Sequence, residues 1–486
     1  MLWGKTMSYG IRKLSTRTKL VAAALALALA GVSHAQTSPT LVGGGATLPS
    51  IGYVGTNAAT NLQVWGTSSD NTSDPIAATS LFGVYEATSG NPNVSYCLTG
   101  SGAGKDILAS PISLTVNGLL TAFSVQNTCA KNSVGTVPGF GAPLVGETSL
   151  GQPNFAGADA PLAESDYENY QSTNGTTEYP TEFPAVAGAV AIAFNLLDDQ
   201  GNAVVAANFS DTQLCNIFSG TDSNWDSSDL ASAFTLKSGD TLNNSQPINV
   251  VYRSDGSGTT FSFSNHLTYA CAALGIGSAS AHFVANQTFT TVVGLYKSTV
   301  PSNWVGASGN PAVATAIQNT SASIGYVETA NALQTNPSIS IADVGGLSPT
   351  ANFGSKLTIT AADLAYNSVI TGASSTNGEA TVATLSSLGL PVPATSCIAL
   401  VNPAEYATPG NIVPSGTYPI VAISYLLGNA QGNGTEQADV QGLLESPYSS
   451  TVQAKVTTIG GTTGLQFLTL GKGSFTATQV GTCLGE

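Results

Sequence analysis

The chain has 486 residues, of which 13 are Lys or Arg and 28 are Asp or Glu, so its formal net charge is −15. This acidic balance argues against nucleic acid and anionic membrane surfaces as partners. The length exceeds what one hydrophobic core usually organises, so we expect at least two domains.

The first 35 residues have the pattern of a signal peptide. The basic stretch RKLSTRTK is followed by the apolar run LVAAALALALAG and by the small-residue site Ser33-His34-Ala35. The apolar run is too short to span a bilayer. We therefore predict cleavage after Ala35, no membrane insertion, and a mature protein that is periplasmic or secreted. Cleavage removes five basic residues and no acidic one, which leaves 8 basic and 28 acidic residues.

Apolar runs alternate with helical patterns from residue 183 onward. Continuous runs rich in Val, Ile and Ala suit strands that are buried on both faces of a sheet. The predicted strands are 183–196, 247–253, 322–328 and 418–427, and the predicted helices are 211–220 and 259–274. This alternation predicts an α/β fold. The stretch 330–415, rich in Thr, Ser and Gly, is expected to hold loops and insertions.

Six cysteines follow the predicted signal peptide. An even number in an exported chain predicts disulfide bonds, although the pairing cannot be deduced from sequence alone. We expect neighbours to pair, because each bond then closes a loop within one region: Cys97 with Cys129, Cys215 with Cys271, and Cys397 with Cys483. A metal site is disfavoured, since no two cysteines have ligand spacing and only His266 and His282 remain after cleavage.

The stretch VYRSDGSGTTFSFSNHL, residues 251–267, contains Arg253, the only arginine beyond the signal peptide. A strand that ends there, a Gly-rich turn and a helix capped by Ser257 or Thr259 would form an anion site. Gly256 and Gly258 let the backbone approach the ligand, hydroxyls add donors, and Arg253 adds a bidentate fork that Asp255 can orient. The alternative is a structural turn with a local ion pair.

Three other turns also present small residues and hydroxyls: GGGATLP (43–49), TGSGAGKDI (99–107) and FAGADAPL (155–162). TGSGAGKDI fails the nucleotide-binding pattern, because Thr99 and Asp106 replace residues that the pattern requires. Asp159 in the third turn would repel a fully ionised anion but can accept a hydrogen bond from a monoprotonated phosphate. Taken alone, each of these turns is better explained as structural.

The motifs together resemble those of PstS-type phosphate-binding proteins, the solute receptors of phosphate ABC transporters. RSDGSGTT is the signature, and the other segments that match occur in the family's order: GGGATLP, GSGAGK, AGADAPL, PAVAGAVAIAFN, IFSGTDSNW, SIGYVE and YPIVAISYLL. GGGATLP, GSGAGK and AG-x-D are similar to the DING branch. The chain has Leu41-Val42-Gly43-Gly44 in place of the Asp-Ile-Asn-Gly opening of that branch.

The resemblance implies a two-lobed, type II periplasmic-binding-protein fold with loop insertions and a hinge, and a monomer without cofactor or metal. Lobe I would comprise 36–187 and 416–486, and lobe II 188–415. The partners would be inorganic phosphate and the permease of a phosphate ABC transporter. The implied phosphate-binding residues are Ala46, Thr47, Leu48, Ser101, Gly102 and Asp159 from lobe I, and Arg253, Asp255, Ser257, Gly258 and Thr259 from lobe II.

Two other functions compete with the receptor. A secreted DING-like phosphatase would need a nucleophile, for which Ser257 is the candidate. Ser257 lacks a Gly-x-Ser-x-Gly setting, and His266 follows nine residues later on the same predicted helix. An extracellular matrix or surface protein on the same fold would bind a partner through its insertions, but the intact RSDGSGTT stretch argues against it.

Overall fold

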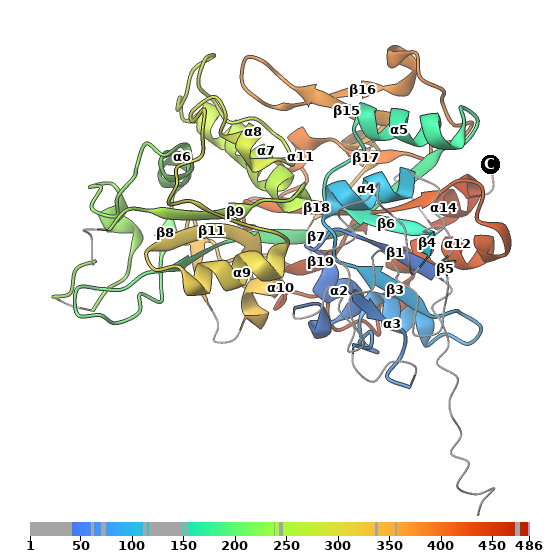
Figure 1. Cartoon of the computed structure of the whole chain (residues 1–486), viewed down its shortest axis with the longest axis horizontal. Coiled ribbons are helices and arrows are strands. Elements are labelled where there is room, and N and C mark those ends of the chain that lie inside the picture. Colours follow the sequence, from blue (N-terminus) through green and yellow to red (C-terminus); the bar gives the residue numbers. More distant parts are fainter. Residues whose placement is uncertain are drawn as a thin grey trace, which may run out of the picture. The chain divides into compact units, whose positions relative to one another are not determined.

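The fold is built around one large sheet (Figure 1). The computed structural model describes residues 41–59, 63–69, 74–109, 114–115, 149–150, 154–237, 239–242, 246–335, 339–354, 357–471 and 477–484. Within them the sheet has the strand order β10-β9-β11-β7-β18-β6-β1-β3-β2, with β12, β19 and β8 attached beside it. Its strands are β1 Leu41–Gly45, β2 Gln63–Trp65, β3 Val94–Cys97, β6 Phe155–Ala158, β7 Pro180–Asn195, β8 Asn208–Phe209, β9 Asn249–Arg253, β10 Val305–Ala307, β11 Ser323–Glu328, β12 Ser340–Val344, β18 Val421–Asn429 and β19 Leu465–Phe467.

Strand β7 joins two groups of parallel strands. Its first part pairs antiparallel with β18, and its second part, from Val190 to Asn195, pairs antiparallel with β11. On one side β1 lies parallel to β3 and β6, and on the other side β9 lies parallel to β10 and β11. Every residue of β7 except the last is buried, which explains why its sequence is apolar without alternation.

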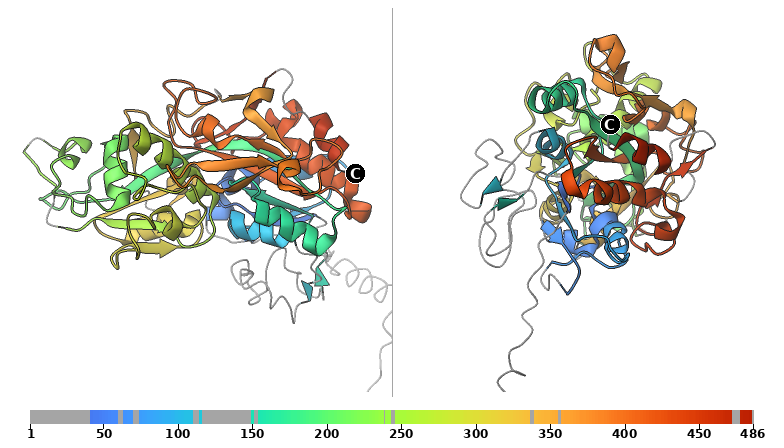
Figure 2. Two further views of the ribbon diagram at one scale, coloured as in Figure 1. Left: turned by 90° about the horizontal axis from the view of Figure 1, so that it is seen from above. Right: turned by 90° about the vertical axis from the view of Figure 1, so that its right-hand side faces the viewer.

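Helices cover both faces of the sheet (Figure 1). They are α2 Ser50–Val54, α3 Leu81–Glu86, α4 Ser101–Ala109, α5 Glu164–Asn174, α6 Asp211–Ser219, α7 Gly258–Ala273, α8 Phe289–Val292, α9 Asn310–Asn319, α10 Thr329–Gln334, α11 Pro403–Tyr406, α12 Gln437–Glu445, α13 Ser450–Gln453 and α14 Ala477–Cys483. Short 3-10 turns are η1 Thr56–Ala59, η3 Leu230–Ala233, η4 Ala361–Asp363, η5 Leu385–Leu388, η6 Gly434–Glu436 and η7 Ser446–Tyr448. Figure 2 shows the C-terminal helices, coloured red, gathered at one end of the sheet. No helix in the described residues is long and apolar enough to cross a membrane.

The helices α7 and α9 pack on opposite faces of the strands β9, β10 and β11 (Figure 1). Phe263 of α7 stacks on Tyr326 of β11 with ring centroids 4.6 Å apart. On the other face, Val313 and Ile317 of α9 pack with Val251 of β9. Burial on both faces is what the apolar runs predicted, and the α/β prediction is confirmed.

The stretch 330–415 differs from the prediction, because it holds several short strands as well as loops. Apart from β12, which belongs to the large sheet, they form two-stranded sheets: β13 Thr358–Ile359 with β20 Thr469–Leu470, β14 Leu364–Tyr366 with β17 Ala399–Val401, and the hairpin of β15 Ser368–Ala373 and β16 Ala380–Thr384. A further pair is β4 Leu114–Thr115 with β5 Ser149–Leu150. Strands β13, β14 and β17 have only two or three residues, and β16 is partly exposed along its length, so these segments carry little hydrophobic pattern.

Two of the three predicted disulfide bonds are present and confirmed. Cys215 of α6 is bonded to Cys271 of α7, and Cys397 is bonded to Cys483 of α14. Cys129, the predicted partner of Cys97, lies outside the described residues, so that pairing stays a prediction. The predicted signal peptide also lies outside them.

Candidate functional site

The candidate site lies where parallel strands end. In open α/β sheets ligands bind outside the carboxyl ends of the strands. The loops after β1, β3, β6, β9 and β10 are joined there by hydrogen bonds. The N–H of Gly258 donates to Ser101 Oγ at 3.2 Å, and the N–H of Asn310 donates to Thr47 Oγ1 at 3.2 Å. Stretches that are distant in sequence are therefore brought together at one place.

Arg253 is buried, with 2% of its surface exposed, and is held on two sides. Its Nε donates to Asp255 Oδ1 at 2.7 Å, and its Nη1 donates to Thr259 Oγ1 at 3.2 Å. Asp255 also accepts the N–H of Gly309. Burial acts to raise the pKa of Asp255, but the Arg253 charge and these hydrogen bonds outweigh it and hold that pKa below its usual value. The pair therefore stays ionised, and Asp255 fixes the direction of the Arg253 guanidinium.

Ser257 is the N-cap of α7, which confirms one of the two predicted caps. Its hydroxyl oxygen accepts the N–H of Thr260 at 3.0 Å. Gly258 packs closely on Asp159 and Ser101, because a Cβ added to it would lie 2.4 Å from Asp159 Cβ. The helix start and the Asp159 loop are therefore in direct contact, and only glycine fits at position 258.

Three hydroxyl oxygens in the site each accept two hydrogen bonds. Ser101 Oγ accepts the N–H groups of Asp159 and Gly258 at 3.0 and 3.2 Å. Thr47 Oγ1 accepts from the backbone N–H and from Nδ2 of Asn310. Thr259 Oγ1 accepts from Arg253 and from Asn310 Nδ2. Because a hydroxyl has two acceptor positions and one hydrogen, the Thr47 and Thr259 hydroxyls are left to act as donors, whereas the Ser101 hydroxyl already donates to Asp159 Oδ2 at 3.4 Å.

Asp159 lies beside these hydroxyls, and only 1% of its surface is exposed. Its Oδ2 accepts a long hydrogen bond from Ser101 Oγ at 3.4 Å. Oδ1 is buried and has no hydrogen bond of normal length and angle among the described residues, although the Ser424 hydroxyl and the Leu48 N–H lie near enough to act on the carboxylate. Burial raises the pKa of Asp159 to about 7, against the opposing effect of the Ser424 hydroxyl, the Arg253 charge, the Ser101 hydroxyl and the Leu48 N–H. A buried carboxylate oxygen that lacks a hydrogen bond of normal geometry favours a ligand that carries a proton.

Two predicted donors are engaged elsewhere, which corrects the roles expected of them. The N–H of Ala46 donates to Gly157 O at 2.8 Å, and the N–H of Gly102 donates to Gly256 O at 3.1 Å. Both bonds connect the loops of the site to one another. These two residues thus fix the loops, and their N–H groups are not directed to a ligand. Lys105, in the same GSGAGK stretch, is paired with Asp166 and donates to Pro161 O.

The geometry does not assemble a hydrolytic pair from Ser257 and His266. His266 Nδ1 lies 2.9 Å from Ala407 O, and its Nε2 lies 3.0 Å from Asp211 Oδ1. Both ring nitrogens therefore have partners other than Ser257. Among the described residues, no group of three or more His, Cys, Asp or Glu side chains is placed to hold a metal ion.

Asn310 was missed by sequence reasoning, although it bonds to two predicted site residues. It begins α9 directly after Gly309 and before Pro311. Proline at the first positions of a helix is a start signal, so SGNP could have been recognised as a second helix N-terminus beside the site. The contacts of Asn310 with Thr47 and Thr259 could not have been recognised from the sequence.

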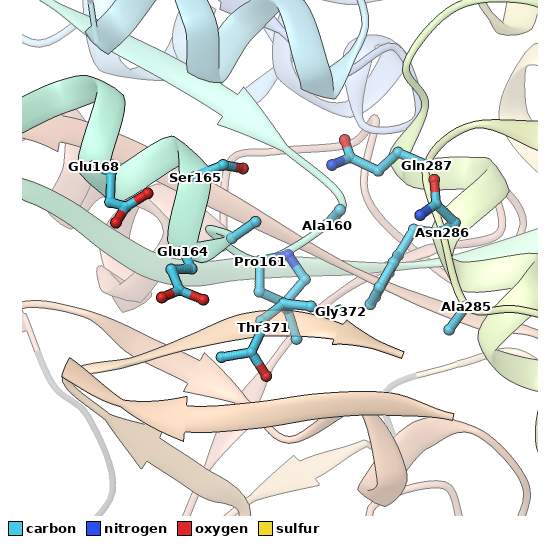
Figure 3. Close-up of a pocket in the computed structure, with 13 residues that line it drawn as sticks. Ala160, Pro161, Glu164, Ser165, Glu168, Ala285, Asn286, Gln287, Thr371 and Gly372 are labelled. Carbon is cyan, nitrogen blue, oxygen red and sulfur yellow. The ribbon is translucent and has the colours of Figure 1, made fainter. Parts of the chain in front are cut away.

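A separate cavity of about 310 Å³ lies beside the site (Figure 3). Figure 3 shows it between α5, which contributes Glu164 and Glu168, and the loop of Asn286 and Gln287. Its wall includes Ala160, the residue after Asp159. The cavity is thus lined by sequence neighbours of the predicted phosphate-binding residues and by none of those residues themselves.

A family model described as "PBP superfamily domain" matches residues 56–438. The chain belongs to the PBP superfamily. Alkaline phosphatase L of Pseudomonas aeruginosa is 30% identical over 261 residues, which are 53% of this chain and 55% of that protein. Phosphate-binding protein PstS 3 of Mycobacterium tuberculosis is 29% identical over 233 residues, 47% of this chain and 54% of that protein. The chain thus spans about half the length of the curated relatives it matches.

Solved structures extend the likeness in fold along most of the chain. A phosphate-binding protein from Stenotrophomonas maltophilia, 23% identical, covers 90% of this chain and 91% of its own with a TM-score of 0.52. A DING protein is among the other structures that match. The resemblance to PstS-type phosphate-binding proteins is confirmed, and so is the two-lobed, type II fold.

Proposed function

We propose that the chain is an exported receptor that binds inorganic phosphate at the strand ends and delivers it to a phosphate ABC transporter. The observation that carries this proposal is that the site holds several hydrogen-bond donors and one buried acceptor, Asp159 Oδ1. The hydroxyls of Thr47 and Thr259 are left as donors beside Arg253, and the buried Oδ1 of Asp159 has no hydrogen bond among the described residues. Monoprotonated phosphate offers several acceptors and one hydrogen, and therefore complements this set.

The same set argues for phosphate over sulfate. A fully ionised sulfate oxygen facing Asp159 Oδ1 would place two acceptors together in a buried site, which is unfavourable. Binding by hydrogen bonds and one guanidinium requires no metal. The proposed lobes, 36–187 with 416–486 and 188–415, meet within β7, and the ligand would lie between them.

A secreted phosphatase is the second candidate, because one relative carries the name alkaline phosphatase L. Hydrolysis would require an activated nucleophile or water. Ser257 caps α7, and His266 is bonded to Asp211 and Ala407. His266 is therefore not placed to act as a base for Ser257, the nucleophile that this function would need, and we favour the receptor.

Calorimetric titration of the phosphate-stripped protein tests the proposal. We expect saturable binding of phosphate, none of sulfate, and a loss of at least about 100-fold in affinity in Arg253→Ala, because a buried charged donor is removed. Arg253→Lys keeps the charge beside Asp255 and serves as a second variant if Arg253→Ala does not fold. Absence of phosphate binding by the folded parent would refute the proposal, and turnover of p-nitrophenyl phosphate by the parent but not by Ser257→Ala would favour the phosphatase.

A further inference from the structure

Asn310 is fully buried and lies between the loops that carry Thr47 and Thr259. Its Nδ2 lies 3.0 Å from Thr47 Oγ1 and 3.0 Å from Thr259 Oγ1. Its own backbone N–H donates to Thr47 as well. One side chain therefore contacts a hydroxyl from the loop after β1 and a hydroxyl from the first turn of α7.

The orientation of the Asn310 amide is fixed by its other end. Oδ1 accepts the backbone N–H of Glu328 at 2.9 Å. A backbone N–H can only donate, so the oxygen must face Glu328 and the NH₂ group must face the two threonines. Reversing the amide would bring two donors together.

The two threonine hydroxyls cannot donate to these neighbours. Thr259 Oγ1 faces the NH₂ group of Asn310 and Arg253 Nη1, neither of which can accept. Thr47 Oγ1 faces the NH₂ group and the N–H of Asn310. Both hydroxyl hydrogens are thereby turned away from the protein donors.

We infer that Asn310 is a positioning residue that commits the Thr47 and Thr259 hydroxyls to donate to the bound phosphate. This inference rests on the proposed function, since phosphate is the acceptor to which the two hydroxyls would donate. Asn310 would act through the threonines without touching the ligand. It would also select against ligands that require hydroxyl acceptors at these two positions.

A double-mutant cycle on phosphate affinity separates this role from packing. We expect Asn310→Ala to weaken binding about 30-fold in the parent, because two hydroxyl rotors lose their fixed direction. In a Thr47→Val or Thr259→Val background, where one of these hydroxyls is absent, the same change should weaken binding only about 5-fold. Asn265→Ala is the matched control, since Asn265 is equally buried but donates to Pro403 O. It should lower the melting temperature and leave the affinity unchanged.

Asn310→Asp is the second variant in case the alanine leaves a cavity that prevents folding. It keeps the volume but replaces the NH₂ group by an acceptor, so the hydroxyls would turn toward it. The added carboxylate charge weakens anion binding both with and without the threonine hydroxyl, so its effect cancels from the coupling energy of the double-mutant cycle. Equal losses for Asn310 variants with and without the threonine hydroxyls would overturn the inference, whereas a folded parent that binds no phosphate would overturn the proposed function first.

Discussion

Replacement of Asp159 by Asn tests both the selectivity and the electrostatics of the site. The change keeps the shape of the side chain, removes its charge and lets the amide present an NH₂ group where Oδ1 has no hydrogen bond among the described residues. Sulfate, which has no proton to offer, could then bind. A hydrogen bond to a charged group contributes about 1.5 to 3 kcal/mol, so the ratio of phosphate to sulfate affinity should fall by roughly 10- to 100-fold.

The same variant should be more stable than the parent at high pH when no ligand is bound. The pKa of Asp159 is raised by burial from 3.8 to about 7, so the folded protein holds a proton that the unfolded chain has released. Stability from this group is therefore complete below the unfolded pKa and is lost as the pH rises through about 7. At about 1.4 kcal/mol for each pKa unit, the variant should gain roughly 4 kcal/mol at high pH.

Thermal unfolding across this pH range, together with calorimetry for both anions, measures the two effects. Glu182→Gln is the control, because Glu182 is also fully buried and its pKa is raised to about 8, yet it accepts the N–H of Leu162 away from the threonines and Arg253. It should gain stability at high pH and leave anion selectivity unchanged. A folded Asp159→Asn protein that still excludes sulfate would refute the acceptor role of Asp159.

Two further predictions concern stability. Gly378→Ala should lower the melting temperature far more than Gly389→Ala, although both glycines have φ +73°. A Cβ at Gly378 would lie 1.7 Å from Phe283 O, whereas a Cβ at Gly389 would have no atom within 4 Å. Equal effects of the two changes would show that the hairpin tip adjusts freely. The double change of Cys215 and Cys271 to Ser should reduce the free energy of unfolding by about 4 kcal/mol, as expected for opening a loop of 56 residues, and denaturant titration would contradict this if the midpoint did not move.

The sequence predicted the parts of the fold that depend on neighbours along the chain. The strand at 183–196 became β7, because an uninterrupted apolar run suits a strand covered on both faces. Ser257 became a helix cap, because its place after the Gly-rich turn suits that role. The pairing of Arg253 with Asp255 could also be expected, because only Ser254 stands between them in the chain and their side chains can reach each other.

The remaining parts depend on contacts between distant segments. Nothing near Asn310 in sequence indicates that its amide meets Thr47, which lies 263 residues away. The N–H groups of Ala46 and Gly102 were expected to face a ligand, but they bond to the neighbouring loops. A local motif shows which groups a turn carries, and only the tertiary arrangement decides which of them stay available.

The proposed binding of an anion by an acidic protein is possible because the proposed site does not depend on net charge. The charge of Arg253 is matched by Asp255, and Asp159 adds a second carboxyl, so the formal charges around the ligand are not positive. Attraction must then come from oriented N–H and O–H dipoles, whose directions are fixed by partners such as Asn310 before the ligand arrives. Dipoles buried from water are screened little by salt. The acidic surface and the proposed phosphate site are therefore compatible, since the surface charge acts at long range and the dipoles of the site act only on contact.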